Sequence, residues 1–288
     1  MKFPGNRWAS SLESGGASTS VAKSIPMRHV VPLPRFTATA AASLQSSARQ
    51  WLGLGLNLVF PPACAACHLS LEPGTLLALC SPCQQEFVDT RPACSRCGLK
   101  VPAEFESTSC PQCRDLRLRF TRVLRLGQYE GGLRSAVLRI KRPHERALAV
   151  ALGDALGENF AVQLSQQMPE VVIPVPMHWT RRAWRGTNCP HIIAGRLASR
   201  LGIPLAAHLL VRSRRTAPQA TLSPNKRRAN VRGAFRVHSH RDLPGARVLL
   251  VDDIMTTGAT LNEAAKVLAK AGAGEITVAV VARAEGLA

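Results

Sequence analysis

The sequence predicts an α/β fold in which a parallel sheet is flanked by helices and preceded by a small cysteine-rich domain. From about residue 123 onward, apolar runs typical of buried strands alternate with helical patterns, and this alternation is typical of parallel sheets. Eight of the nine cysteines lie before residue 115, in four Cys-x₂-Cys pairs. The run VLLVDDIMTTGAT at 248–260 joins a buried strand to a helix through two acids and a Gly-containing turn.

The strands and helices of the α/β part can be placed by composition and period. Strands are expected at 123–129, 171–176, 233–238, 248–251 and 275–283. Helices are expected at 131–164 with a break near Pro143, at 191–202 and at 259–272. The stretch 212–233 is basic and has no apolar period, so we expect a structureless loop of the kind that often covers a functional site.

The cysteine pairs indicate metal binding. Each pair can form a knuckle that presents two thiolates to one tetrahedral ion, and two knuckles complete a Cys₄ site. Cys64 to Cys94 spans 30 residues, as does Cys80 to Cys110; this repeat indicates a duplicated ribbon and favours pairing the first two knuckles and the last two. Crossed pairing and a single occupied site are left open. Without a secretory signal, metal is favoured over disulfides. One or two structural Zn²⁺ ions are expected on Cys64, Cys67, Cys80, Cys83, Cys94, Cys97, Cys110 and Cys113.

The composition has a large excess of basic over acidic residues. The 288 residues include 37 Lys and Arg against 18 Asp and Glu, and from Arg117 to Arg247 the count is 24 against 6. Such an excess favours a polyanionic partner, either a pyrophosphate-bearing ligand or nucleic acid. A solvated basic surface is the alternative. With eight Phe, four Trp and one Tyr, the chain offers little material for stacking on single strands.

No apolar run approaches the roughly 20 residues that a membrane span needs, so we expect no membrane insertion and a cytoplasmic location. Residues 1–50 are rich in Ser, Ala and Arg and lack a continuous apolar region, and we expect a disordered tail there. An organelle transit peptide and a start codon assigned too early are open alternatives.

The segment 252–260 predicts a site for a sugar phosphate. Asp252 and Asp253 would lie at the carboxyl end of a strand, where open α/β sheets bind ligands. The residues that follow supply backbone N–H groups, hydroxyls and one Gly at a helix start, which together form an anion site. The acids can accept hydrogen bonds from ribose hydroxyls. A strand–turn–helix unit whose acids only cap the helix is the alternative.

The run 248–260 resembles, at every position, the phosphoribosyl-pyrophosphate-binding motif of type I phosphoribosyltransferases. Three further segments resemble the ComF family: Y-x-G-x-L-R…K at 129–141, P-V-P…R-R…R-G-x-N at 174–188 and R-T-x-x-Q-x-x-L-S…R-x-N-V-R-G-A-F at 215–235. The resemblance spans about 51–285. It implies a tail at 1–50, a double zinc ribbon at 51–118, a type I phosphoribosyltransferase-like domain at 119–288, and a link to DNA uptake in natural competence. The family usually reads R-G-F-N-Q where this chain has Thr187 and Cys189 in place of the aromatic and the amide.

Site residues follow from the resemblance and from phosphate chemistry. Asp252 and Asp253 are expected to act as the catalytic acids, holding the ribose hydroxyls or a Mg²⁺ that bridges to pyrophosphate. The residues expected to bind the 5-phosphate are Thr256, Thr257, Gly258, Ala259 and Thr260. Those expected to bind pyrophosphate are Arg181, Arg182, Arg185, Lys226, Arg227 and Arg228.

Two classes of function are expected. The first is a protein that binds phosphoribosyl pyrophosphate, or a related sugar phosphate, with Mg²⁺; it is a candidate phosphoribosyltransferase whose acceptor the sequence does not name. No carboxylate occurs between Asp253 and Glu263, which argues against the base-salvage mechanism of purine-salvage relatives. The second is a non-catalytic protein that handles single-stranded DNA, or an adaptor whose zinc ribbons dock a competence helicase. Cys189 is expected to be a small buried residue and not a nucleophile.

Overall fold

A computed structural model describes residues 61–72, 75, 77–105, 110–177, 187–214, 216, 224–238 and 243–285. The tail predicted at 1–50 lies outside this part of the chain, as do Arg181, Arg182 and Arg185. Among the described residues, no helix combines the length and the apolar character that crossing a membrane requires.

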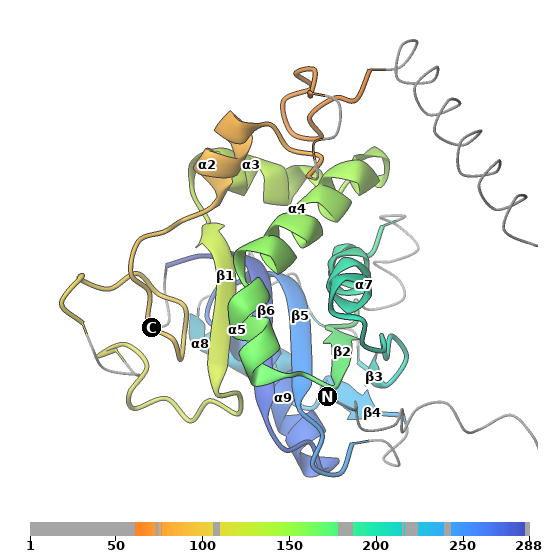
Figure 1. Ribbon diagram of the computed structural model, residues 1–288. Coiled ribbons are helices and arrows are strands. Elements are labelled where there is room, and N and C mark those ends of the chain that lie inside the picture. The colour runs from red at the N-terminus through yellow and green to blue at the C-terminus, as the bar shows by residue number, and fades with distance from the viewer. Residues whose placement is uncertain are drawn as a thin grey trace, which may run out of the picture. The chain divides into compact units, whose positions relative to one another are not determined.

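A four-stranded parallel sheet forms the centre of the fold (Figure 1). Its strands, in spatial order, are β1(Arg122–Gln128), β6(Ile276–Arg283), β5(Val248–Met255) and β2(Val171–Pro174). Each neighbouring pair runs parallel. Every residue of β6 is buried, as expected for an interior strand of a sheet that is covered on both faces.

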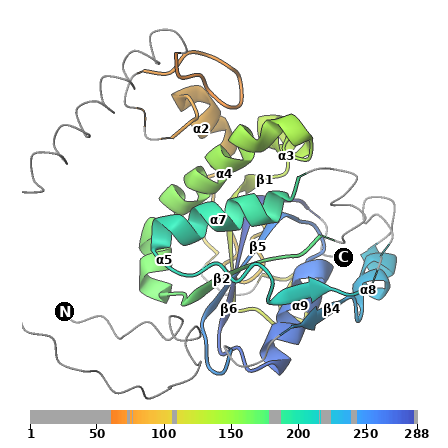
Figure 2. The same cartoon turned by 90° about the vertical axis from the view of Figure 1, so that its right-hand side faces the viewer.

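Helices cover the two faces of this sheet (Figure 2). One face carries α3(Gly131–Arg139), α4(Arg146–Asn159), α5(Ala161–Gln167) and α7(Cys189–Leu201), and the other carries α9(Ala259–Lys270). On the first face Leu152 and Leu197 pack into one apolar cluster with Leu249. On the second, Leu268 packs into a separate cluster with Leu250. The side chains of successive residues of β5 thus pack into the apolar clusters on opposite faces of the sheet, which is the layered arrangement that the sequence predicts.

Strand β5 is longer than the sequence predicts. The expected strand ends at Val251, whereas β5 continues to Met255. The cause is the neighbouring strand, because β6 continues alongside and pairs Met255 with Arg283. The two acids therefore lie inside a paired strand and not in the turn after it.

The region between β2 and β5 also differs from the prediction. The strand expected at 233–238 is the shorter β4(Phe235–Val237), which pairs antiparallel with β3(Leu210–Arg212) in a separate two-stranded sheet. The stretch 212–233 is not structureless, because α8(Pro224–Val231) forms within it. Pro224 begins this helix, and proline favours the first helical position. Helix α8 lies beside α9 (Figure 2), so a tertiary contact supports a helix that has no apolar period.

The two cysteine ribbons lie on opposite faces of the sheet. The first ribbon, which includes α2(Ser81–Phe87), shares an apolar cluster with α3 and α4, and the second shares the cluster of α9. Both contact the outer edge of β1: Asp89 donates its N–H to the carbonyl of Leu126 at 2.9 Å, and Val123 donates to that of Ser95 at 2.8 Å. The domain boundaries at 50/51 and 118/119 stay a prediction.

Candidate functional site

Asp252 and Asp253 lie where β5 runs past the end of β2. The last pair between these strands joins Pro174 to Val251. Beyond that pair β5 has β6 on one side and, among the described residues, no paired strand on the other. Asp252 is 9% exposed, and the side chain of Asp253 is 15% exposed. Two adjacent, largely buried carboxylates therefore occupy the end of the parallel sheet where such folds bind ligands.

The electrostatic state of these acids favours a cationic or hydrogen-donating ligand. Burial raises the pKa of the Asp252 carboxyl well above its ordinary value, and the negative charge of Asp253 raises it further. The Nζ atom of Lys141 lies 3.6 Å from Oδ2 of Asp253, and its positive charge acts in the opposite direction on Asp252. A divalent cation or ribose hydroxyls at this place would stabilise the ionised pair.

The loop between β5 and α9 has the form of an anion site. Gly258 precedes α9 with φ +72°, in the left-handed region. A Cβ atom there would lie 2.8 Å from Cε of Met255, so the turn requires glycine. Thr257 is buried and its Oγ1 accepts a hydrogen bond from the N–H of Ala259 at 3.3 Å. The first turn of α9 contains no acid, and the positive end of its dipole favours a bound anion.

Lys141 is a site residue that our assignment from the sequence missed. It lies just beyond α3, and the signal that could have found it is its place in the Y-x-G-x-L-R…K segment. Cys189 and Thr187, which depart from the family pattern, stabilise the backbone around Lys141. The thiol of Cys189 donates to the carbonyl of Ile140 at 2.9 Å, and Oγ1 of Thr187 donates to the carbonyl of Lys141 at 3.4 Å. Burial, followed by the charge of Asp253, raises the pKa of Cys189 to about 11. Cys189 therefore remains a thiol at neutral pH and supports the turn that carries Lys141.

Lys226, Arg227 and Arg228 lie on α8, next to α9. The backbone N–H of Gly233 donates to Oε1 of Glu263 at 2.9 Å, which fastens the end of this segment to the first half of α9. The role of these three basic residues, and of Arg181, Arg182 and Arg185 outside the described residues, stays a prediction.

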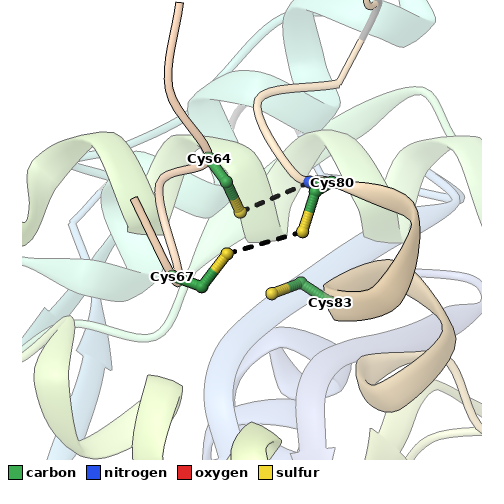
Figure 3. A group of neighbouring side chains, drawn as sticks. All are labelled: Cys64, Cys67, Cys80 and Cys83. Atoms are coloured by element: carbon green, nitrogen blue, oxygen red, sulfur yellow. Dashed lines mark hydrogen bonds between the residues drawn. The ribbon is translucent and has the colours of Figure 1, made fainter. Parts of the chain in front are cut away.

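The eight paired cysteines form two groups of four, in the pairing that the 30-residue repeat favours. In each group the sulfur atoms lie within 4.8 Å of one another, and the groups are Cys64, Cys67, Cys80 and Cys83 (Figure 3) and Cys94, Cys97, Cys110 and Cys113. All eight are free of disulfides.

The two groups also share their backbone pattern. The N–H of Cys80 donates to Sγ of Cys64 at 3.3 Å (Figure 3), and that of Cys110 donates to Sγ of Cys94 at 3.4 Å. His68 and Gly98 occupy equivalent turn positions with φ +63° and +73°. His68 thus belongs to the knuckle turn and completes no ligand set.

Four converging sulfur atoms without oxygen or imidazole ligands fit a closed tetrahedral zinc site. Seven of the eight cysteines are buried, and Cys67 is exposed. A hydrogen bond from the thiol of Cys97 lowers the pKa of Cys94 to about 4, and the same hydrogen bond raises the pKa of Cys97. Cys94 is therefore the residue of this group that favours the thiolate, the form that binds metal. Both groups support structural zinc, which would supply folding free energy to segments that have few apolar residues.

Comparison with known proteins agrees with this architecture. Residues 55–114 match the double zinc ribbon domain, and residues 191–286 match the phosphoribosyl transferase domain. The fold and the cysteine groups thus define a protein with a double zinc ribbon and a phosphoribosyltransferase domain.

Two relatives match most of the chain, and a third matches a shorter part of it. Competence protein F of Haemophilus influenzae is 34% identical over 215 residues, which are 72% of this chain and 90% of that protein. DNA utilization protein YhgH of Salmonella typhimurium is 30% identical over 227 residues, which are 77% of this chain and 96% of that protein. An adenine phosphoribosyltransferase of Treponema pallidum is 40% identical over 85 residues, 30% of this chain and 43% of that protein. The chain belongs to the ComF family, together with Competence protein F and YhgH.

Proposed function

We propose that this protein binds phosphoribosyl pyrophosphate together with Mg²⁺ at the end of β5. The observation that carries the proposal is the arrangement of Asp252 and Asp253 two residues before a loop that requires glycine at Gly258. Acids that are buried beside each other need a positive or hydrogen-donating partner, and the loop and helix that follow favour a phosphate. A ribose that carries a 5-phosphate and a metal-bound pyrophosphate meets both needs.

Each group of residues has a proposed role. Asp252 and Asp253 accept hydrogen bonds from the ribose 2- and 3-hydroxyls or bind Mg²⁺. Lys141 forms an ion pair with Asp253 and holds its side chain in place. The 5-phosphate is bound by the loop residues Thr256, Thr257, Gly258, Ala259 and Thr260. The pyrophosphate is bound by Arg181, Arg182, Arg185, Lys226, Arg227 and Arg228.

The chemistry that such a site suits is transfer of the phosphoribosyl group. A nucleophile on the acceptor forms a bond to ribose C1 while the bond from C1 to pyrophosphate breaks, and pyrophosphate leaves with the electron pair. The chain contributes position and electrostatic stabilisation. Since no carboxylate lies between Asp253 and Glu263, the loop offers no general base, and the acceptor must lose its proton to another group.

Calorimetry of the purified protein with phosphoribosyl pyrophosphate and Mg²⁺ tests the binding. We expect the variant Asp252→Asn with Asp253→Asn to bind at least about tenfold more weakly, a loss of about 1.4 kcal/mol. The matched control is Asp154→Asn, which changes a buried acid of α4 that is paired with Arg196 of α7. The control should keep wild-type affinity. Absence of heat for the wild-type protein would remove the proposal.

We further propose a role in DNA uptake or utilisation and a cytoplasmic location; the similarity to Competence protein F and to DNA utilization protein YhgH supports the role. A second candidate function is direct handling of single-stranded DNA, with the ribbons docking a helicase partner. The basic excess of 37 against 18 residues favours it. If six or more phosphates of a single strand are contacted, affinity should fall by about 300-fold or more between 50 and 200 mM salt. A response to salt that is flat would contradict an electrostatic DNA interface.

A further inference from the structure

Arg283 joins the second cysteine group to the candidate phosphate loop. It is the last residue of β6 and is 0% exposed. Its Nε donates to the carbonyl of the metal-ligating residue Cys97 at 2.8 Å. Its Nη1 donates to the carbonyls of Met255 at 3.0 Å and Thr256 at 2.5 Å, and also to that of Ala284. One side chain therefore spans from a knuckle to the first residues of the loop.

These hydrogen bonds fix the direction of the loop's donors. A trans peptide is planar, and its C=O and N–H point in opposite directions. When the carbonyls of Met255 and Thr256 point at Arg283, the N–H groups of Thr256 and Thr257 point away from it. The carbonyl of Met255 also accepts the backbone N–H of Ala284 at 2.9 Å, so the pairing of β5 with β6 shares in orienting the N–H of Thr256. Arg283 orients the N–H of Thr257 through the carbonyl of Thr256, and the knuckle holds Arg283 through the carbonyl of Cys97.

The knuckle itself is packed tightly against the sheet. The N–H of Val123 in β1 donates to the carbonyl of Ser95 at 2.8 Å. A Cβ added to Gly98 would lie 2.9 Å from Cγ1 of Val123 and 3.6 Å from Cδ of Arg283. A side chain at Gly98 would therefore displace Val123 of the edge strand and would lie in ordinary contact with the stem of Arg283.

Electrostatics also favours the contact between Arg283 and the second cysteine group. A fully buried guanidinium needs nearby negative charge or acceptors to offset its loss of hydration. Four thiolates around one Zn²⁺ carry a net charge of about −2, and the backbone of one of these ligands accepts a hydrogen bond from Arg283. The second cysteine group is therefore fitted to stabilise the charge that fastens the loop.

The first cysteine group provides an internal comparison. Its arginine is Arg139 of α3, which donates to the carbonyl of Ala66 at 2.5 Å and pairs with Glu145 at 2.9 Å. This arginine joins the first knuckle to the helical layer. Within the part of the chain that the structure describes, the hydrogen bonds of Arg139 go to the first ribbon and to Glu145 and not to the loop, so the two groups have different connections.

We propose that the second cysteine group is a working part of the sugar-phosphate site, with Arg283 as the positioning residue that transmits the state of the knuckle to the loop. This inference rests on the proposed function. Metal loss from Cys94, Cys97, Cys110 and Cys113 should loosen the loop, whereas metal loss from Cys64, Cys67, Cys80 and Cys83 should leave it in place.

Hydrogen exchange of the full-length protein, read on peptides that cover residues 255–262, tests the link without any ligand. The variants are Arg283→Met, the conservative Arg283→Lys, and Cys110→Ser with Cys113→Ser. The matched control is Cys80→Ser with Cys83→Ser. We expect faster exchange in the loop for the first three and wild-type exchange for the control. Equal exchange in the two cysteine variants, whether both fast or both as in wild type, overturns the proposal.

A second measurement uses the wild-type protein, so it does not depend on the folding of any variant. Coupling between two sites is reciprocal, so phosphoribosyl pyrophosphate with Mg²⁺ should slow alkylation of the second cysteine group in the presence of a chelator. We expect a several-fold slowing there and none in the first group, as read by mass spectrometry of each cysteine. Equal protection of both groups, or none despite measured binding, contradicts the coupling. If calorimetry shows no binding at all, the proposed function fails, and hydrogen exchange still decides the link.

Discussion

Replacing Gly258 by alanine tests whether the shape of the loop is what binds phosphate. Gly258 has φ +72°, and a Cβ there would lie 2.8 Å from Cε of Met255. A side chain in the left-handed region costs about 1–2 kcal/mol. Moving the flexible end of Met255 off its rotamer adds about 0.5–1.5 kcal/mol. The variant should therefore lose about 1.5–3.5 kcal/mol of stability.

A matched control separates backbone strain from loss of the site. Gly202 ends α7 with φ +65°, and no atom lies within 4 Å of an added Cβ. Gly202→Ala should cost only the backbone part, about 1–2 kcal/mol. Since 1 kcal/mol lowers Tm by about 2–4 °C in a unit of this size, we expect a fall of about 2–8 °C for Gly202→Ala and of about 3–14 °C for Gly258→Ala.

Binding is measured on both variants by calorimetry with phosphoribosyl pyrophosphate and Mg²⁺, well below either Tm. We expect Gly258→Ala to lose at least about tenfold in affinity, which is about 1.4 kcal/mol, because the strained turn no longer aligns the loop's N–H groups. Gly202→Ala should bind like wild type. Wild-type affinity in Gly258→Ala would refute the argument that this turn binds the phosphate, and equal losses in both variants would indicate a global effect.

Two further predictions concern stability. Because burial raises the pKa of Asp252, its protonated form stabilises the fold; this contribution is complete below the unfolded-state pKa of about 3.9 and is lost as pH rises through the higher folded-state pKa. Asp252→Asn should therefore raise the Tm of the ligand-free protein at pH 7 and flatten its dependence on pH, and a lower Tm at pH 7 in thermal melts would contradict this reasoning. Metal analysis should return two zinc ions per chain, and one in a variant that lacks either cysteine group; four mapped disulfides would reverse the assignment.

Much of the fold could be predicted because its signals are local. The break near Pro143 appears as a 3₁₀ turn at Pro143–Glu145, since proline disrupts the interior of a helix. Gly202 ends α7 in the left-handed conformation, as its position after an apolar helix predicts. Each Cys-x₂-Cys knuckle is also a local turn, and the repeat of the spacing was enough to favour the pairing that the structure shows.

The alternation of strands and helices, the cysteine groups and the acid–turn–helix segment could be predicted from the residues alone, because each is encoded within a few neighbouring positions. Three features became known only from the folded chain: β5 extends to Met255, Lys141 faces Asp253, and Arg283 contacts Cys97 across 186 positions of sequence. Such contacts depend on how separate elements pack, and neither segment alone contains that information. The residues proposed to bind the ligand can be recognised in the sequence, whereas the residues that position them are identified only when the packing is known.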